Sequence, residues 1–265
     1  MTTQRSAALF LALMLGGAAV GSSAQDMVAA TPEWQLALSA DSLAKAGNVV
    51  VIDSTDRRRI LGQVRISEVA GASTAGTTWA VATLLEGLAE LTPLDAAAAR
   101  RVTYSSQDLL RSPWIFLLVN RYLFTESDLR NLGRYMTQGG FLLADGGGDI
   151  GGEADVFART LIQKALATAG KRAQFRRLRA DHPIYHSYFD FDHPPLALQT
   201  GAQRIDYLIG IRVGGRLVAV ISYQGLHKVL GGDDQLDITR HLHFGINTII
   251  FALTQEGGLT RRVWR

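Results

Sequence analysis

The stretch "PWIFLLVNRYLFTESDLRNLGRYMTQGGFLLAD" (Pro113–Asp145) decides the fold class. Two continuous apolar runs, 113–119 and 141–145, flank a segment whose apolar residues recur with helical spacing. Apolar runs of this length without polar alternation are typical of parallel strands that are buried on both faces. Thr125 is placed to cap the intervening helix, with Asp128 at its third position and glycines at its end. The stretch therefore predicts a strand, a helix and a second strand of a parallel sheet.

Alternation of helices and strands continues on both sides of this unit. The further elements expected are helices over 77–91, 153–170 and 236–258 and short strands over 48–53, 61–69, 101–104 and 174–178. The first two of these strands flank a polar turn, and we expect them to pair. Two alternating runs around Gly214-Gly215 predict a hairpin over 206–224. The pattern predicts a doubly wound α/β sheet that carries an antiparallel hairpin and a packing helix.

The first 24 residues have the features of a secretory signal peptide. Arg5 precedes an apolar run over 7–20, and the small residues Ser22 and Ala24 stand before Gln25. The alternative is a membrane anchor, but the run has 14 residues, whereas a spanning helix needs about 20. We therefore expect cleavage after Ala24, export to the periplasm or the medium, and no membrane span in the mature chain.

Composition excludes several kinds of chemistry. The chain has no cysteine, so it has no disulfide, no thiol nucleophile and no thiolate metal ligand, and core burial must hold the fold. The net charge is +3, with basic clusters at 57–59, 171–179 and 261–265. These clusters lack interleaved aromatic residues, so we interpret them as solvated faces and expect no nucleic-acid partner.

Open α/β sheets bind ligands beyond the carboxyl ends of their strands, and three loops are expected there. Loop 70–79 is rich in Gly, Ser and Thr and suits either an anion or sugar site or a flexible connection, because it has no Walker pattern. Loop 120–125 follows the first strand of the opening stretch. Loop 144–155 holds five glycines and four carboxylates. Its Asp145 stands where catalytic carboxylates lie in such folds, or it accepts backbone N–H bonds and fixes the turn.

The stretch "RADHPIYHSYFDFDHPP" (Arg179–Pro195) holds three of the six histidines. Asp181 before His182-Pro183 fits an acidic cap with proline in the first turn of a helix. His182 and His186 would share a face of a regular helix, but a metal site needs three converging ligands. The third ligand would come from Asp190, Asp192 or His193. Among a capped turn, a ligand-facing loop and a metal site, we favour a capped turn that borders a pocket, with no metal and no other cofactor.

Four segments together resemble the bacterial domain-of-unknown-function family 4159. They are "SPWIFLLVNRYLFTESDLRNLGRYMTQGGFLLAD", "DHPIYHSYFD", "GRLVAVISY" and "HFGINTIIFALT", within roughly 65–254. The family is grouped with the class I glutamine-amidotransferase-like superfamily, which implies a flavodoxin-like doubly wound parallel sheet with helices on both faces. It implies no established activity. Amidotransferases of the superfamily use a cysteine, so that chemistry is excluded here. Family members often carry an acidic pair after the "FLLAD" strand, and the second position here is Gly146.

The expected organisation is a signal peptide (1–24), a lead-in segment (25–63), an amidotransferase-like α/β domain (64–258) and a basic tail (259–265). Two functions are compatible with it. The first is a non-catalytic binding or accessory domain of the cell envelope, which binds a small molecule, a carbohydrate or an envelope protein. The second is an envelope hydrolase that acts on a glycan through Asp145 and His182 as acid and base. No Gly-x-Ser-x-Gly elbow supplies a serine nucleophile.

We expect one shared depression to contain the functional side chains, because loops that leave adjacent parallel strands converge at one rim. The candidate binding residues are Trp79, Asn120, Asp145, Asp149, His182 and Tyr185. Trp79 would form a flat wall for a sugar or would simply be core.

Overall fold

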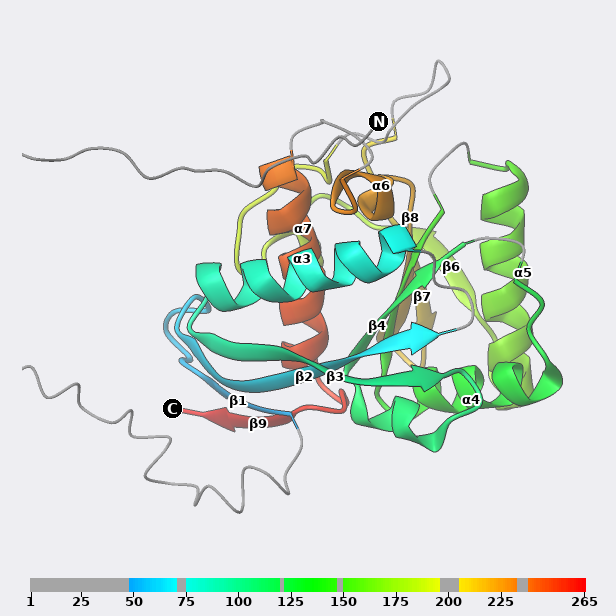
Figure 1. Cartoon of the computed structure of the whole chain (residues 1–265), viewed down its shortest axis with the longest axis horizontal. Coiled ribbons are helices and arrows are strands. Elements are labelled where there is room, and N and C mark those ends of the chain that lie inside the picture. Colours follow the sequence, from blue (N-terminus) through cyan, green and yellow to red (C-terminus); the bar gives the residue numbers. More distant parts are fainter. Residues whose placement is uncertain (1–47, 71–74, 120–121, 147–149, 196–204, 233–237) are drawn as a thin grey trace, which may run out of the picture.

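The computed structural model describes residues 48–70, 75–119, 122–146, 150–195, 205–232 and 238–265. These residues form a mixed α/β fold with two sheets (Figure 1). The strands are β1 (Val49–Ile52), β2 (Ile60–Ala70), β3 (Leu94–Thr103), β4 (Trp114–Leu118), β5 (Phe141–Asp145), β6 (Gln174–Arg177), β7 (Ile209–Val213), β8 (Arg216–Ser222) and β9 (Arg261–Trp264). The α-helices are α3 (Ala75–Leu91), α4 (Glu126–Thr137), α5 (Glu153–Thr168), α6 (Leu226–Val229) and α7 (Ile238–Thr254), and two 3₁₀ turns are η1 (Gln107–Arg111) and η2 (Pro183–Tyr185).

The opening stretch folds as expected. Strands β4 and β5 are buried along their whole length and pair in parallel. Between them, Thr125 caps α4: its hydroxyl accepts from the Asp128 backbone N–H, and the Asp128 carboxylate accepts from the Thr125 backbone N–H. Alternate side chains of β4 enter opposite cores, Trp114 toward α3 and α7 and Ile115 toward α4 and α5. Burial on both faces explains why the strands read as unbroken apolar runs.

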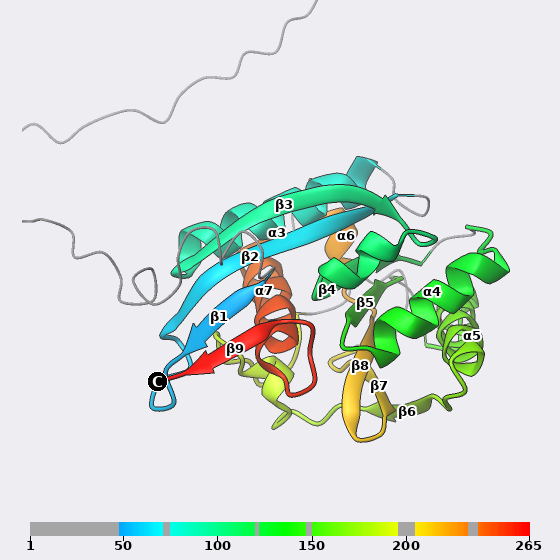
Figure 2. The ribbon, with the colours of Figure 1, turned by 90° about the horizontal axis from the view of Figure 1, so that it is seen from below.

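Sheet B has the strand order β4-β5-β8-β7-β6. Strands β4, β5 and β8 run parallel, and the hairpin expected at Gly214-Gly215 adds β7 in the antiparallel direction. Both glycines have positive φ, 57° and 87°, which a two-residue hairpin turn of this kind requires. Helices α4 and α5 cover one face of the sheet, and α7 lies on the other face, between the two sheets (Figure 2).

Sheet A departs from the expectation of a single sheet. Its order is β3-β2-β1-β9, and it is mixed, because β1 pairs antiparallel with β2 while β3 and β9 join in parallel. The expected pairing of the first two strands is confirmed, and its direction is antiparallel. Strand β3 starts at Leu94, well before the expected 101–104. The sequence did not indicate its first half, because alanine has little β-propensity. Pairing with the long β2 overrides that propensity.

Both ends of the described chain belong to sheet A. Strand β2 begins at Ile60 and so crosses the expected boundary between residues 63 and 64. The expected basic tail, 259–265, contains β9, whose ladder includes bonds from Arg261 N to Asn48 O (3.0 Å) and from Arg265 N to Ile52 O (3.2 Å). Its arginines are mostly exposed, which is usual for an edge strand. The strand therefore lacks the apolar pattern by which a strand is predicted from sequence.

Among the helices of the described residues, none combines the length and the apolarity that crossing a bilayer requires.

Candidate functional site

The carboxyl edge of sheet B brings together the ends of β5 and β8. Asp145 pairs in register with Ser222, and its side chain is completely buried. Its carboxylate accepts three hydrogen bonds: from Ser222 Oγ (3.0 Å), from the backbone nitrogen of His227 (3.0 Å) and from His227 Nδ1 (2.6 Å). Three donors around a buried carboxylate hold it in one position beside the histidine.

His227 reaches Asp145 because the chain turns sharply after β8. Gly225, at the start of α6, adopts the left-handed conformation with φ 67°, which glycine enters without steric cost. The turn places His227 back over the strand end, where its side chain is 12% exposed. Since Nδ1 donates to the carboxylate, the neutral ring carries its lone pair on Nε2. A carboxylate that orients a histidine in this way is the arrangement of a general base.

Gln224 adds an unused donor beside this pair. Its side chain is fully buried. Its Oε1 accepts from the backbone nitrogen of Tyr223 (3.1 Å) and lies 2.8 Å from Ser222 Oγ, whose single hydrogen is shared between this oxygen and Asp145. Its Nε2 is buried and has no hydrogen-bond partner within the described structure. Buried donors without partners are rare and costly, and a ligand or a water molecule is a common reason for them.

A second buried carboxylate, Asp155, fixes the start of α5. It accepts from Tyr223 Oη (2.6 Å), Arg159 Nε (2.8 Å) and the backbone nitrogen of Gly151 (2.9 Å). Burial, together with the neighbouring Asp155 carboxylate, raises the pKa of the Tyr223 phenol well above its usual value. The acidic loop 144–155 is therefore partly structural. Asp149 and Asn120, both expected at the site, lie outside the described residues.

His182 lies elsewhere. It is the N-cap of η2, where its Nδ1 faces the backbone nitrogen of Ile184 (3.2 Å), while Asp181 instead pairs with Arg179 on the surface (3.2 Å). The expected cap was therefore wrong by one residue. The Nε2 of His182 is 2.9 Å from Nη2 of Arg212. Burial and the positive charge of Arg212 lower the pKa of His182 to about 4.

The structure does not bring Asp145 and His182 together. His182 shares a cavity with the β7–β8 turn, at the amino end of β8, whereas Asp145 pairs with Ser222 at the carboxyl end. Leu217, opposite Arg212, and Ser222 are roughly 17 Å apart along the strand. The expectation of one shared depression was wrong, because after β6 the chain packs against α7 on one face of the sheet instead of closing the carboxyl rim.

The other two expected residues differ in exposure. Tyr185 is core: it is buried, its hydroxyl accepts from the Leu208 backbone nitrogen (3.0 Å), and burial raises its pKa to about 12. Trp79 is 65% exposed and so is not core. It stands one helical turn before Thr83, which donates to Leu230 O (3.2 Å) just after α6. Since residues four apart share a helix face, Trp79 lies on the side of α3 that faces α6.

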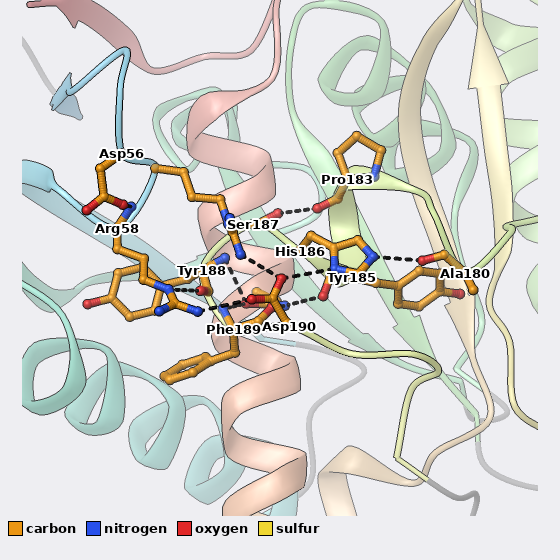
Figure 3. Close-up of polar contacts among 12 residues, drawn as sticks. Asp56, Arg58, Ala180, Pro183, Tyr185, His186, Ser187, Tyr188, Phe189 and Asp190 are labelled. Atoms are coloured by element: carbon orange, nitrogen blue, oxygen red, sulfur yellow. Dashed lines mark hydrogen bonds and ion pairs between the residues drawn. The ribbon is translucent and has the colours of Figure 1, made fainter.

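The rest of the His-rich stretch forms a turn that side-chain hydrogen bonds and ion pairs hold in place (Figure 3). Asp190 accepts from Arg57 (2.6 Å), Arg58 (3.0 Å) and Nδ1 of His186 (3.1 Å), and Nε2 of His186 faces Ala180 O (2.9 Å). Within the described residues, no three His, Asp or Glu side chains converge as a metal site would require.

Buried Asn247 of α7 holds the same turn from beneath. Its Nδ2 donates to Tyr185 O (3.1 Å) and Phe189 O (2.7 Å), and its Oδ1 accepts from the backbone nitrogens of Tyr188 (3.1 Å) and Phe189 (2.8 Å). One amide side chain thereby satisfies four backbone groups, which explains why this polar residue is buried.

Sequence reasoning missed His227, because 82 positions separate it from Asp145. A signal was nevertheless present: a glycine and a histidine follow the predicted hairpin 206–224 in "ISYQGLH" and mark a sharp turn at a carboxyl strand end.

Comparison with known proteins gives a family and no activity. The model of the family described as Domain of unknown function (DUF4159) matches residues 61–253. No curated protein matches the chain. The matched range includes both Asp145 and His227.

Proposed function

The chain belongs to the DUF4159 family, and we propose that it is a hydrolase in which His227, oriented by Asp145, activates the attacking water. The observation that carries the proposal is the 2.6 Å contact between His227 Nδ1 and the fully buried Asp145 carboxylate. This contact leaves Nε2 as the basic nitrogen. The site lies at the carboxyl edge of parallel strands, where α/β folds bind their ligands.

The reaction that suits this site is hydrolysis of a carboxylic ester. His227 Nε2 takes a proton from water as the water oxygen bonds to the carbonyl carbon, and the ring then returns the proton to the leaving alcohol oxygen. The products are an acid and an alcohol. Hydrolysis of a glycosidic bond usually takes two carboxyl groups that flank the bond, whereas the carboxylate here is engaged in holding the histidine.

An acylated carbohydrate is the substrate class that we favour. Trp79 offers an exposed flat ring on the side of α3 that faces α6, and α6 carries His227. Aromatic faces of this kind combine apolar contact area with a rigid shape, which suits the faces of sugar rings. The glycan substrate expected from the sequence is therefore kept, with His227 in place of His182.

The test uses the chain without residues 1–24 and two chromogenic probes, 4-nitrophenyl acetate and 4-nitrophenyl β-D-glucoside. We expect hydrolysis of the acetate alone, with kcat/KM at least about 100-fold lower in His227→Gln. His186→Gln removes a histidine that also contacts an aspartate and serves as the matched control, with unchanged activity. Equal activity in His227→Gln and the parent would reject the proposal.

A non-catalytic binding or accessory domain of the cell envelope is the second candidate. The observation in its favour is that Asp145 also accepts the backbone N–H of His227, so the carboxylate fixes the turn as well as the ring. In this case neither probe is hydrolysed, and acylated oligosaccharides bind without turnover.

Two further proposals concern the scaffold and the compartment. The parallel strands β4, β5 and β8, with helices on both faces, support assignment of sheet B to the flavodoxin-like fold of class I glutamine amidotransferases. The apolar run over 7–20 supports export. N-terminal sequencing of protein from the envelope fraction should begin at Gln25, and an intact Met1 in the cytosol would contradict export.

A further inference from the structure

A cavity lies at the edge of sheet B opposite to the Asp145–His227 site. It has a volume of about 540 Å³ and opens between η2, the β7–β8 turn and the end of α7. Phe251, Leu217 and Pro183 form apolar walls, and His182, Arg212 and Gln255 contribute polar groups. None of these residues belongs to the Asp145–His227 site, so the cavity is a separate feature of the fold.

The hydrogen-bond contacts of His182 include more donors than acceptors. A neutral imidazole has one N–H and one lone pair, yet both ring nitrogens face an outside donor, Ile184 N–H at Nδ1 (3.2 Å) and Arg212 Nη2 at Nε2 (2.9 Å). If Nδ1 accepts from the backbone, then Nε2–H and the guanidinium N–H point at each other. The arrangement lacks an acceptor at this position.

Arg212 and Gln255, which line the same cavity as His182, add further donors there. Within the described residues, no carboxylate forms an ion pair with Arg212, whose other contact is Gly215 O (2.6 Å). Gln255 lines the same cavity, and its Nε2 is buried without a hydrogen-bond partner. Three donor groups therefore border one cavity, from His182 just before η2, from Arg212 of β7 and from Gln255 just after α7.

The remaining charges around the cavity do not supply that acceptor. Arg216 directs its guanidinium away, to the backbone oxygens of Gly140 and Met136 near the end of α4. Asp181 is paired with Arg179. Glu256 also lines the cavity, but it is exposed to solvent and forms no ion pair within the described structure. The balance beside His182 remains positive.

We propose that this cavity binds a small organic oxyanion, a carboxylate or a phosphate, between Arg212, His182 and Gln255. The anion oxygens accept from the guanidinium, from His182 Nε2–H and from the Gln255 amide, which resolves the opposed donors. The apolar walls receive the carbon part of the ligand.

The experiment titrates the chain without residues 1–24 with sodium phosphate and with sodium succinate at constant ionic strength, with sodium chloride as the reference. We expect saturable binding of at least one anion by calorimetry, at least tenfold weaker in Arg212→Gln. Arg176→Gln removes an exposed arginine of neighbouring β6 and should bind as the parent does. Preference for phosphate or for succinate identifies the class of the natural ligand.

A second readout needs no substitution. The free His182 ring has a pKa of about 4 because of burial and Arg212, and a bound anion stabilises the protonated ring, so its pKa rises on saturation. Ring NMR signals of His182 report this directly. Absence of saturable binding by both anions, equal weakening in the two arginine variants, or a His182 signal that saturating anion leaves unchanged would each overturn the proposal.

Discussion

The two edges of sheet B place a histidine beside partners of opposite charge. At the carboxyl edge, His227 lies 2.6 Å from the buried Asp145 carboxylate. At the amino edge, His182 lies 2.9 Å from the Arg212 guanidinium. The Asp145 carboxylate accepts a hydrogen bond from Nδ1–H of His227, which leaves Nε2 as the basic nitrogen, whereas the Arg212 guanidinium opposes protonation of the His182 ring. The comparison shows that the neighbour, not the residue type, decides between a general base and an uncharged donor to an anion.

The largest effect on stability is expected from a substitution at the carboxyl edge of sheet B. Asp145→Ala removes three accepted hydrogen bonds from a fully buried position and leaves the donors of Ser222 and His227 unsatisfied. We expect the free energy of unfolding to fall by about 3 kcal/mol, measured by urea denaturation. Asp95→Ala is the control, because its partner Arg65 is at the surface, and it should cost less than about 1 kcal/mol. Equal losses in the two variants would contradict a buried functional dyad.

The next effect tests whether the His-rich turn is structural and independent of the sites at the two edges of sheet B. Asn247→Leu keeps the volume of the side chain but leaves four backbone groups of the turn without partners. We expect a loss of about 2–3 kcal/mol in the free energy of unfolding, measured by denaturant titration. The ester hydrolysis assigned to His227 should persist in folded protein. Loss of hydrolysis together with an unchanged unfolding midpoint would show that the turn belongs to the active site.

A smaller effect appears in the pH dependence of stability. The pKa of His182 falls from 6.5 to about 4 on folding, so the unfolded chain binds this proton first as the pH falls. The stability from the neutral ring is complete above pH 6.5 and is lost as the pH falls toward 4. We expect His182→Gln to lose about 1 kcal/mol less than the parent across this window, a figure reduced for the partial exposure of the ring. Parallel stability curves would contradict the assignment.

The smallest effect concerns the exposed ion pairs in Figure 3. Burial and hydrogen bonds act in opposite directions on Asp190, and the bonds from His186 and Arg57 prevail, so its pKa is lowered. Its side chain is 56% exposed, and such pairs contribute little in water. Asp190→Asn should therefore change the free energy of unfolding by less than about 1 kcal/mol, with a difference that shrinks further in 1 M salt. A larger or salt-independent loss would show that the turn is a stronger brace than its exposure indicates.

The sequence predicts local structure better than it predicts proximity. The capped helix between β4 and β5 and the glycine hairpin were correct, because capping and turn residues act over a few positions. The second sheet was not foreseen, since the partners of β2 are decided by packing across the whole chain. Strand β9 was not predicted, because a strand at the exposed edge of a sheet can carry arginines and so lack an apolar pattern.

The candidate site shows the same limit. Asp145 was found from its place at a strand end, but its partner was sought in the stretch that has the most histidines. That stretch is held by Asn247, Arg57 and Arg58, and it serves mainly as structure. His227 stands alone in the sequence and meets Asp145 only through the parallel pairing of β5 with β8. Crowding of polar residues along a chain does not indicate crowding in space.

The most direct test of the Asp145–His227 assignment is the tautomeric state of His227, measured by long-range proton–nitrogen NMR correlations on protein labelled with nitrogen-15 at histidine. We expect that neutral His227 carries its proton on Nδ1, held by Asp145, and that Nε2 has the nitrogen shift of an unprotonated base. Asp145→Asn should abolish this preference. A neutral His227 ring protonated on Nε2 in the parent protein would show that Asp145 does not orient His227 as a base.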